Sequence, residues 1–180
     1  MAHSERARLT KTSPAPSFGS PPGRALPEPA AEPGTLLGYR LWQVHHLWHK
    51  HIEQQLRAVD LTHLQYVLLG ATNFLIRDGE VPSQIRLANF TKVEKMMVSK
   101  NLRVLERRGF LSRVPDPCDR RANRIQLTAA GIRLLRRTLA ISAKAHASFF
   151  RAIGGEWKEL NHLLQVLMES RLERKPKRAR

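Results

Sequence analysis

The stretch from residue 83 to residue 127 constrains the fold of this 180-residue chain more than any other part of it. Ser83 can act as the N-cap of a short helix that ends near Phe90, and Thr91-Lys92 then leaves room only for a tight turn. A second, basic helix continues to Arg108, where Gly109 can adopt the left-handed conformation that ends a helix. A short helix, a tight turn and a longer basic helix predict a helix-turn-helix.

A β-hairpin is predicted directly after this basic helix. Residues 110–114 are typical of a short strand, and residues 124–127 alternate polar and apolar as a returning strand should. The residues between them, 115–123, are rich in Pro and Asp and carry two arginines, which indicates a loop with a cationic tip. Such a hairpin is the wing of a winged helix-turn-helix, so the expected fold is mainly α with a small β-hairpin wing.

The segments on either side have helical periodicity and long apolar stripes. Apolar side chains recur at steps of three and four in residues 35–60, and residues 128–173 continue the pattern in two helices separated by Gly154-Gly155. One chain of this length cannot cover so much apolar surface, so we expect a helical dimerisation region, although intrachain packing accounts for part of it. The stripe of the first segment comprises Leu37, Leu41, Val44, Trp48, Ile52, Gln55 and Val59.

The two ends differ in composition from the rest of the chain. Residues 1–34 hold seven of the eleven prolines, which predicts a disordered arm because repeated proline prevents helix and strand alike. Residues 174–180 form a short basic tail. No apolar run is long enough to cross a bilayer and the N-terminus does not resemble a secretion signal, so a cytoplasmic protein without a membrane partner is expected.

Positive charge is concentrated in the predicted winged helix-turn-helix. The formal net charge is +16, and residues 83–127 contain 11 Lys and Arg against 4 Asp and Glu, whereas residues 36–82 contain four of each. This distribution is typical of a protein that binds a polyanion. Neither an enzyme nor a bound cofactor is expected, because the sequence has no Gly-rich phosphate loop and no nucleophile elbow, and its single cysteine excludes a multi-cysteine metal site.

The basic helix is predicted to have one buried and one cationic face. Val98, Leu102 and Leu105 recur at i, i+4 and i+7, which indicates the core side. An α-helix fits the major groove of duplex DNA, so we expect the opposite face to meet bases and phosphates, with a merely solvated face as the alternative. The candidate DNA-contacting residues of this helix and of the turn before it are Lys92, Met96, Ser99, Lys100, Arg103 and Arg107.

Several short motifs resemble those of the MarR family of bacterial transcription regulators. They include Leu-Thr-x-x-Gln-Tyr at 61–66, Asp-Pro-Cys-Asp-Arg-Arg-Ala at 116–122 and Leu-Thr-x-x-Gly at 127–131, and the resemblance extends over residues 36–172. It implies a two-fold homodimer joined by the terminal helices. It also implies a wing that enters the minor groove, and regulation, usually repression, that a small ligand or an oxidant often relieves.

The same resemblance assigns roles to residues of the wing. Asp119 is expected to support the guanidinium of Arg121, which enters the minor groove, where a narrow A·T tract attracts a planar cation. Arg120 and Arg124 are expected to contact phosphates. A flexible cationic turn without such roles is the alternative.

Aromatic and histidine side chains of the first two helices suggest a ligand pocket. Relatives of the MarR family often bind phenolic or other aromatic effectors, so Trp42, His45, His49 and Tyr66 are candidate effector-pocket residues, with ordinary core packing as the alternative. His45 and His49 are also spaced to share a zinc ion. We expect no metal, because no carboxylate or cysteine was found at a spacing that completes the site.

Together these features predict a sequence-specific DNA-binding transcriptional regulator. Residues 61–127 would form its DNA-binding domain, and a homodimer would bind a pseudo-palindromic operator in double-stranded DNA as a repressor that a small-molecule effector releases. The alternative is a basic RNA- or ribosome-associated winged-helix protein. That function would require neither a minor-groove arginine nor a symmetric dimer.

Overall fold

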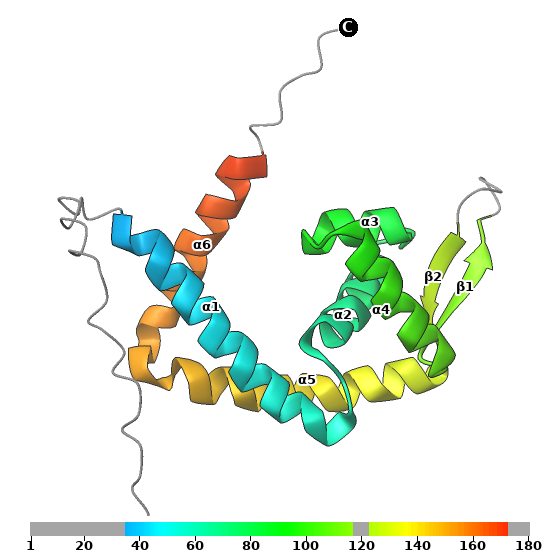
Figure 1. The fold of residues 1–180 in the computed structure, drawn as a ribbon, viewed down its shortest axis with the longest axis horizontal. Coiled ribbons are helices and arrows are strands. Elements are labelled where there is room, and N and C mark those ends of the chain that lie inside the picture. The colour runs from blue at the N-terminus through cyan, green and yellow to red at the C-terminus, as the bar shows by residue number, and fades with distance from the viewer. Residues whose placement is uncertain (1–34, 117–122, 173–180) are drawn as a thin grey trace, which may run out of the picture.

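The computed structural model describes residues 35–116 and 123–172, and in these ranges the chain forms six α-helices, two 3₁₀ helices and one two-stranded antiparallel sheet (Figure 1). This confirms the predicted mainly α fold with a β-hairpin wing. The elements in chain order are α1 (Thr35–Leu56), η1 (Arg57–Val59), α2 (His63–Arg77), α3 (Gln84–Thr91), α4 (Lys95–Arg107), β1 (Leu111–Pro115), β2 (Asn123–Leu127), α5 (Ala129–Phe149), η2 (Phe150–Glu156) and α6 (Trp157–Leu172).

Side-chain caps fix the starts of three helices. Thr62 and Gln65 form a reciprocal capping box at α2, in which each side chain accepts a hydrogen bond of 3.2 Å from the other residue's backbone N–H. The Ser83 hydroxyl accepts from the backbone of Arg86 at α3, as predicted, and the Thr128 hydroxyl caps α5. Each cap satisfies a backbone donor that would otherwise lack a partner, which is typically worth about 1 kcal/mol.

The junction between α4, β1 and α5 is closed by backbone contacts. Gly109 has φ 73°, so it ends α4 in the predicted left-handed conformation. The Thr128 hydroxyl donates to the Gly109 carbonyl at 2.6 Å, and the backbone N–H of Thr128 donates to the carbonyl of Phe110 at 3.1 Å. A Cβ atom at Gly131 would collide with that Phe110 oxygen, so this position requires glycine. The Leu-Thr-x-x-Gly motif therefore holds the start of α5 against the end of the helix-turn-helix.

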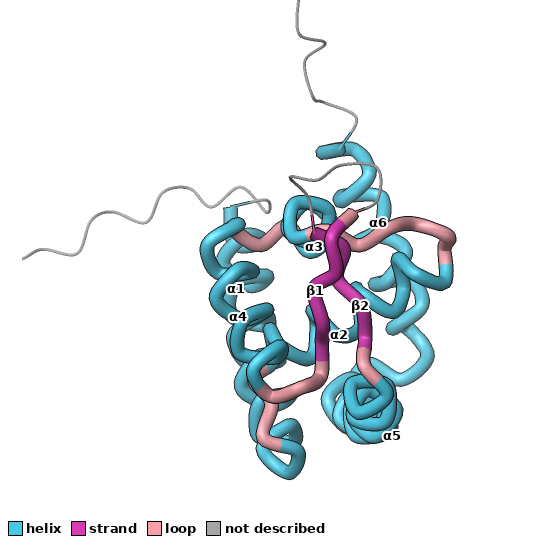
Figure 2. The backbone as a smooth tube through the Cα atoms, turned by 90° about the vertical axis from the view of Figure 1, so that its right-hand side faces the viewer, coloured by secondary structure: helices cyan, strands magenta, loops and turns pink. Residues whose placement is uncertain are grey.

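The hairpin is anchored along both of its strands. β1 pairs with β2 from Leu111↔Leu127 to Pro115↔Asn123, within one residue of the predicted strands. Residue 83 forms an isolated bridge with residue 124, and Ile125 donates to the carbonyl of Pro82 at 2.7 Å. The start of α3 therefore lies along β2. Seen from the side, the two strands stand between α4 and the beginning of α5 (Figure 2).

The hydrophobic core lies where α2, α3, α4 and the hairpin meet the end of α1 and the first half of α5. In the apolar stripe predicted for the first helix, Gln55 is exposed and Leu56 is buried instead, because Leu56 lies one turn after the buried Ile52 on the same face. Fully or almost fully buried core residues include Ile52, Leu56, Leu68, Leu69, Leu75, Leu87, Val98, Leu102, Leu105, Leu111 and Ile125.

Two helical segments lie outside this core, and we call residues 36–47 of α1 together with α6 the apolar arms. Every described side chain of these segments is exposed, and Figure 2 shows the two arms well apart. α5 connects the lobe that contains α2–β2 to the arms (Figure 1). This helix ends at Phe149 rather than at Gly154-Gly155, and a 3₁₀ segment with Gly154 at φ 51° precedes α6. No helix in the described ranges combines the length and the apolar character needed to cross a membrane.

Candidate nucleic-acid interface

The second helix of the helix-turn-helix, α4, has the two faces that its periodicity predicts. Val98, Leu102 and Leu105 are buried against the core. On the opposite side Lys100, Arg103 and Arg107 are exposed, and the Met96 side chain is 83% exposed. These four residues and the half-buried Ser99 line one hollow on the surface, together with Met97, Val104 and Glu106.

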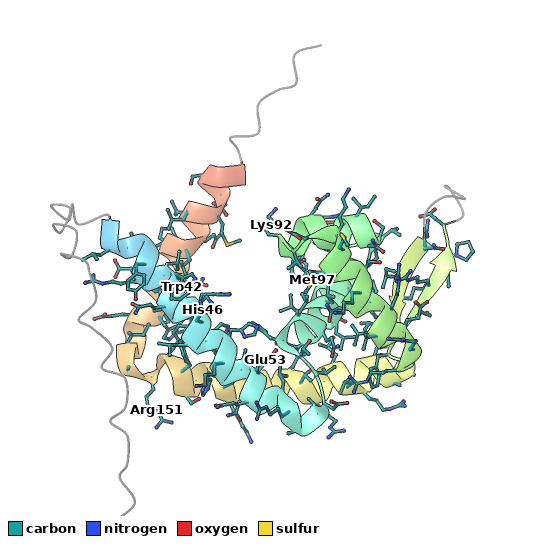
Figure 3. All side chains as sticks on the ribbon, viewed as in Figure 1. Trp42, His46, Glu53, Lys92, Met97 and Arg151 are labelled. Carbon is teal, nitrogen blue, oxygen red and sulfur yellow. The ribbon has the colours of Figure 1, made fainter. Side chains whose placement is uncertain are left out.

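The turn before α4 adds a further cation to this face. Lys92 follows α3 in the left-handed conformation with φ 58°, which reverses the chain within a few residues. Its side chain is exposed and lies at the same end of the lobe as Met97, as Figure 3 shows. Lys92 therefore belongs to the turn of the motif rather than to α4 itself.

Ion pairing divides the basic residues of the lobe into two groups. Arg86 pairs with Glu80, Arg108 with Asp60, Arg113 with Glu106 and Arg124 with Asp116. In contrast, over the described part of the chain no carboxylate lies within ion-pair distance of Lys92, Lys100, Arg103 or Arg107. Four unneutralised cations thus lie on the exposed face of α4 and the turn before it, and in the described chain the exposed Lys95, at the start of α4, and Arg77, on α2, also have no carboxylate within ion-pair distance.

The paired arginines hold the motif together. The Nε atom of Arg113 on β1 lies 3.3 Å from a carboxylate oxygen of Glu106 on α4, so a charge contact joins the wing to this helix. At the end of α4, the Arg108 guanidinium donates to the Asp60 carbonyl at 2.6 Å and lies 3.0 Å from its carboxylate. The pairs fix the position of α4 relative to the hairpin and to the α1–α2 turn. Arg108 and Asp60 are 48 residues apart, so no local sequence pattern indicates this pair.

Of the candidate residues in the wing, the structure describes one. Arg124 is half-buried near the loop end of the hairpin, opposite Val114, and makes two hydrogen bonds to Asp116, at 2.9 and 3.2 Å. This bidentate pair holds the guanidinium where β1 and β2 meet the loop. Asp119, Arg120 and Arg121 lie outside the described residues.

The candidate effector-pocket residues lie in two separate places. Trp42 lies on α1 beside His46, with ring centroids 4.2 Å apart and the rings tilted by 42° (Figure 3). His45 and His49 follow on the same helix, with ring centroids 6.2 Å apart. Tyr66 lies on α2, where its hydroxyl donates to Ser142 of α5 at 3.0 Å. Tyr66 therefore connects α2 to α5.

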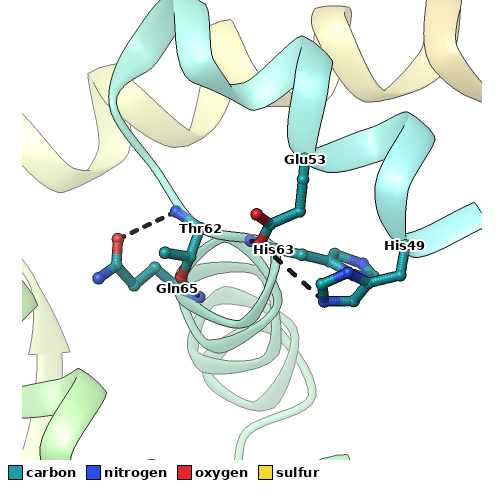
Figure 4. Close-up of polar contacts among 5 residues, drawn as sticks. All are labelled: His49, Glu53, Thr62, His63 and Gln65. Carbon is teal, nitrogen blue, oxygen red and sulfur yellow. Dashed lines mark hydrogen bonds and ion pairs between the residues drawn. The ribbon is translucent and has the colours of Figure 1, made fainter. Parts of the chain in front are cut away.

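A carboxylate overlooked in the sequence lies beside the histidines. Glu53, four residues after His49, accepts a hydrogen bond of 2.9 Å from the backbone N–H of His63, and its oxygen is 4.0 Å from the His49 Nε2 atom (Figure 4). Burial, followed by the nearby His49, lowers the pKa of His63. The four-residue spacing between His49 and Glu53, which places both side chains on one face of α1, is the sequence signal that could have identified this carboxylate. Among the described residues, however, no three potential ligands are arranged to hold a metal ion.

Helix α3, a tight turn, the basic helix α4 and the antiparallel hairpin define a winged helix-turn-helix protein. Residues 61–122 match the model of the MarR family. The chain is also 36% identical over 135 residues to the uncharacterized HTH-type transcriptional regulator YdcH of Bacillus subtilis (strain 168), an alignment that covers 75% of this chain and 92% of YdcH. The chain belongs to the MarR family, a family of transcriptional regulators.

Solved structures of the same fold agree with this assignment. The organohalide-sensing regulator RdhR, solved with 2,4-dichlorophenol bound, superposes with a TM-score of 0.70 at 23% identity, covering 83% of this chain and 87% of RdhR. MepR of S. aureus, solved in complex with DNA, superposes with a TM-score of 0.64 at 26% identity, covering 74% of this chain and 96% of MepR. Both likenesses extend well beyond the winged motif.

Proposed function

We propose that this MarR-family regulator works as a homodimer that binds a pseudo-palindromic operator in double-stranded DNA and represses transcription until a small-molecule effector releases it. The observation that carries this proposal is the exposed face of α4, on which Lys100, Arg103 and Arg107 have no carboxylate partner in the described chain. Cations that the protein does not neutralise itself are suited to phosphates and to guanine edges. That MepR was solved in complex with DNA supports the same assignment.

In this proposal the DNA-binding domain comprises residues 61–127 and uses two elements. Helix α4 enters the major groove, where Lys100 and Arg103 contact guanine or phosphate, Met96 and Ser99 contact bases or backbone, and Lys92 and Arg107 contact flanking phosphates. The wing enters the minor groove through Arg121, which Asp119 supports, while Arg120 binds phosphate. Arg124 would contact phosphate from its pair with Asp116, which fixes the direction of its guanidinium.

The dimer in this proposal is joined by residues 35–60 and 128–173; the predicted arm, 1–34, and the basic tail, 174–180, lie outside the described residues. Leu37 on α1 and Leu167 on α6 are 62% and 51% exposed, and both arms carry several such side chains. Two-fold pairing would remove this apolar surface from water. It would also set two α4 helices at a separation of about one turn of DNA, ~34–36 Å.

The effector in this proposal is a small aromatic molecule, for which Trp42, His45, His49 and Tyr66 are the candidate contacts. Support comes from RdhR, which senses organohalides and was solved with 2,4-dichlorophenol bound. The exposed Trp42 ring and the neighbouring imidazoles offer stacking surfaces, and Tyr66 already joins the two helices α2 and α5. We place the protein in the cytoplasm, where a regulator has access to DNA.

The test is a selection of binding sites from random duplexes with the full-length protein, followed by a footprint on the DNA that flanks its own gene. We expect a palindromic sequence whose half-sites lie one helical turn apart, and a Kd for it well below that for random duplex at the same salt concentration. Replacing Arg121 with Ala should weaken operator binding strongly and leave the dimer intact. Equal affinity for operator and random duplex, or tighter binding to single-stranded or structured RNA, would contradict the proposal.

A further inference from the structure

The face of α4 that carries the free cations also carries one large apolar side chain. Met96 is 83% exposed, the largest exposed fraction of any large hydrophobic residue in the described chain, whereas its neighbour Met97 is 47% exposed. Most other exposed large apolar side chains of the described chain lie on the arms. A large apolar side chain that remains in water does not contribute to stability through burial. The role of Met96 therefore depends on what covers this side chain in the DNA complex.

Met96 is the second residue of α4. In a helix-turn-helix, the N-terminal part of the second helix meets the base edges, whereas later residues are nearer to the backbone. Met96 shares a hollow with Lys100 and Arg103, one and two turns further along the helix. The cations would bring this hollow onto the DNA and thereby bury the thioether against the floor of the major groove.

Only one base presents an apolar group to the floor of the major groove. Guanine, adenine and cytosine expose hydrogen-bonding atoms there, whereas thymine also exposes its 5-methyl group. A thioether is polarizable, forms at most weak hydrogen bonds and fills irregular apolar gaps well. We infer that Met96 is a specificity-determining residue that selects a thymine in each half-site by packing its thioether against the thymine methyl; this inference rests on the proposed function.

The geometry of α4 also predicts the surroundings of that thymine. Met96 and Lys100 are four residues apart, which corresponds to a rise of about 6 Å along the helix, or roughly two base-pair steps. Lysine contacts the O6 and N7 atoms of guanine in the major groove. The half-site should therefore contain a thymine about two base pairs from a guanine, or from the phosphate that Lys100 binds.

The test uses the full-length protein and the operator obtained by selection. Each thymine of one half-site and its symmetry mate are replaced with deoxyuridine, which lacks only the methyl group. At one symmetric pair the Kd should rise by roughly four-fold per half-site, the effect of burying one methyl group fewer. Met96→Ala should bind the thymine and deoxyuridine operators equally, and Met96→Leu, which keeps an apolar side chain, should retain most of the preference.

Met97→Ala is the matched control, because it makes the same change one residue further along the helix, at a side chain that lines the same hollow but is much less exposed, 47% against 83%. Both alanine variants should fold, since alanine favours helix, and thermal melting checks this. Met97→Ala should keep the preference for thymine. If no replacement of thymine with deoxyuridine in a palindromic operator raises the Kd, or if Met96→Ala still prefers thymine to deoxyuridine, this inference is overturned but the proposed function is not. Failure to select any sequence overturns the proposed function, and this inference with it.

Discussion

The lobe formed by α2–β2 and the apolar arms are built from similar amino acids but differ in how they use them. In the lobe, the leucines at 68, 75, 87, 102 and 105 are at most 1% exposed. In the arms, leucines at 37, 41, 163 and 167 are all more than half exposed. The lobe therefore buries most of its leucines within one chain, whereas the arms require a second surface to cover theirs. Stability of the lobe should be independent of protein concentration, and that of the arms should not be.

A leucine-to-alanine change in the lobe should have the largest effect on folding. Leu102 is 1% exposed, so Leu102→Ala leaves a cavity among tightly packed side chains and should reduce the free energy of unfolding by about 2–5 kcal/mol. Urea titrations monitored by circular dichroism would measure this. The loss should be the same at low and high protein concentration, and a loss that vanishes on dilution would show that the lobe, too, depends on the partner chain.

The same change in an arm should act on association instead. Leu167→Ala removes an exposed side chain of α6, so the fold of a single chain should be unaffected. Half-burial of this leucine at a dimer interface is worth roughly 1 kcal/mol per protomer, so the Kd of the dimer should rise about thirty-fold. Sedimentation equilibrium would measure the Kd. If the wild-type chain is monomeric at micromolar concentration, the interpretation of the arms as a dimer interface is wrong.

Signals that are local in the sequence predicted the fold of the lobe. Ser83 caps a helix, Gly109 ends one, and the loop composition of residues 115–123 predicts the hairpin, because each of these effects depends on a few consecutive residues. The burial of Leu56 in place of Gln55 was not predicted. Apolar stripes on helices continue after either three or four residues. Both Gln55 and Leu56 fit this spacing after Ile52, so the spacing alone does not show which of them meets the core.

The candidate DNA-binding face could be predicted only in part. The spacing of apolar residues in α4 distinguishes its buried face from its exposed face, because successive side chains of an α-helix are rotated by about 100° around its axis. The sequence alone does not tell which arginines are neutralised. Arg108 and Asp60 are 48 residues apart, and only the packing of α4 beside the α1–α2 turn brings them together. The distinction between paired and free cations therefore depends on the tertiary structure.

Removing one of the free cations tests this distinction. If Lys100 binds one phosphate in each half-site, Lys100→Gln should lower the slope of log Kd against log salt concentration by about 0.9 per protomer, or about 1.8 for a dimer. Lys50→Gln is the matched control, because Lys50 is exposed on α1, outside the candidate face, and its replacement should leave the slope unchanged. Fluorescence anisotropy over a range of salt concentrations measures both. Equal slopes for Lys100→Gln and the wild type, with unchanged sequence preference, would exclude Lys100 from the interface.

The smallest effect is expected at the boundary between the two regions, where α1 meets α2. His63 lies near His45, His49 and Glu53, and burial is the main cause that lowers its pKa. Because the unfolded chain then binds a proton more readily than the folded one, the contribution of His63 to stability is complete above pH ~6.5 and is lost as the pH falls through the lowered pKa.

Two variants test this contribution. Glu53→Gln keeps an acceptor for the His63 N–H but removes the charge that raises the pKa of His63, so it should increase the loss of stability at acidic pH. His63→Gln should reduce the loss. Urea titrations from pH 7.5 to 5 at one protein concentration compare the variants, and parallel curves for all three proteins would show that His63 does not couple protonation to folding.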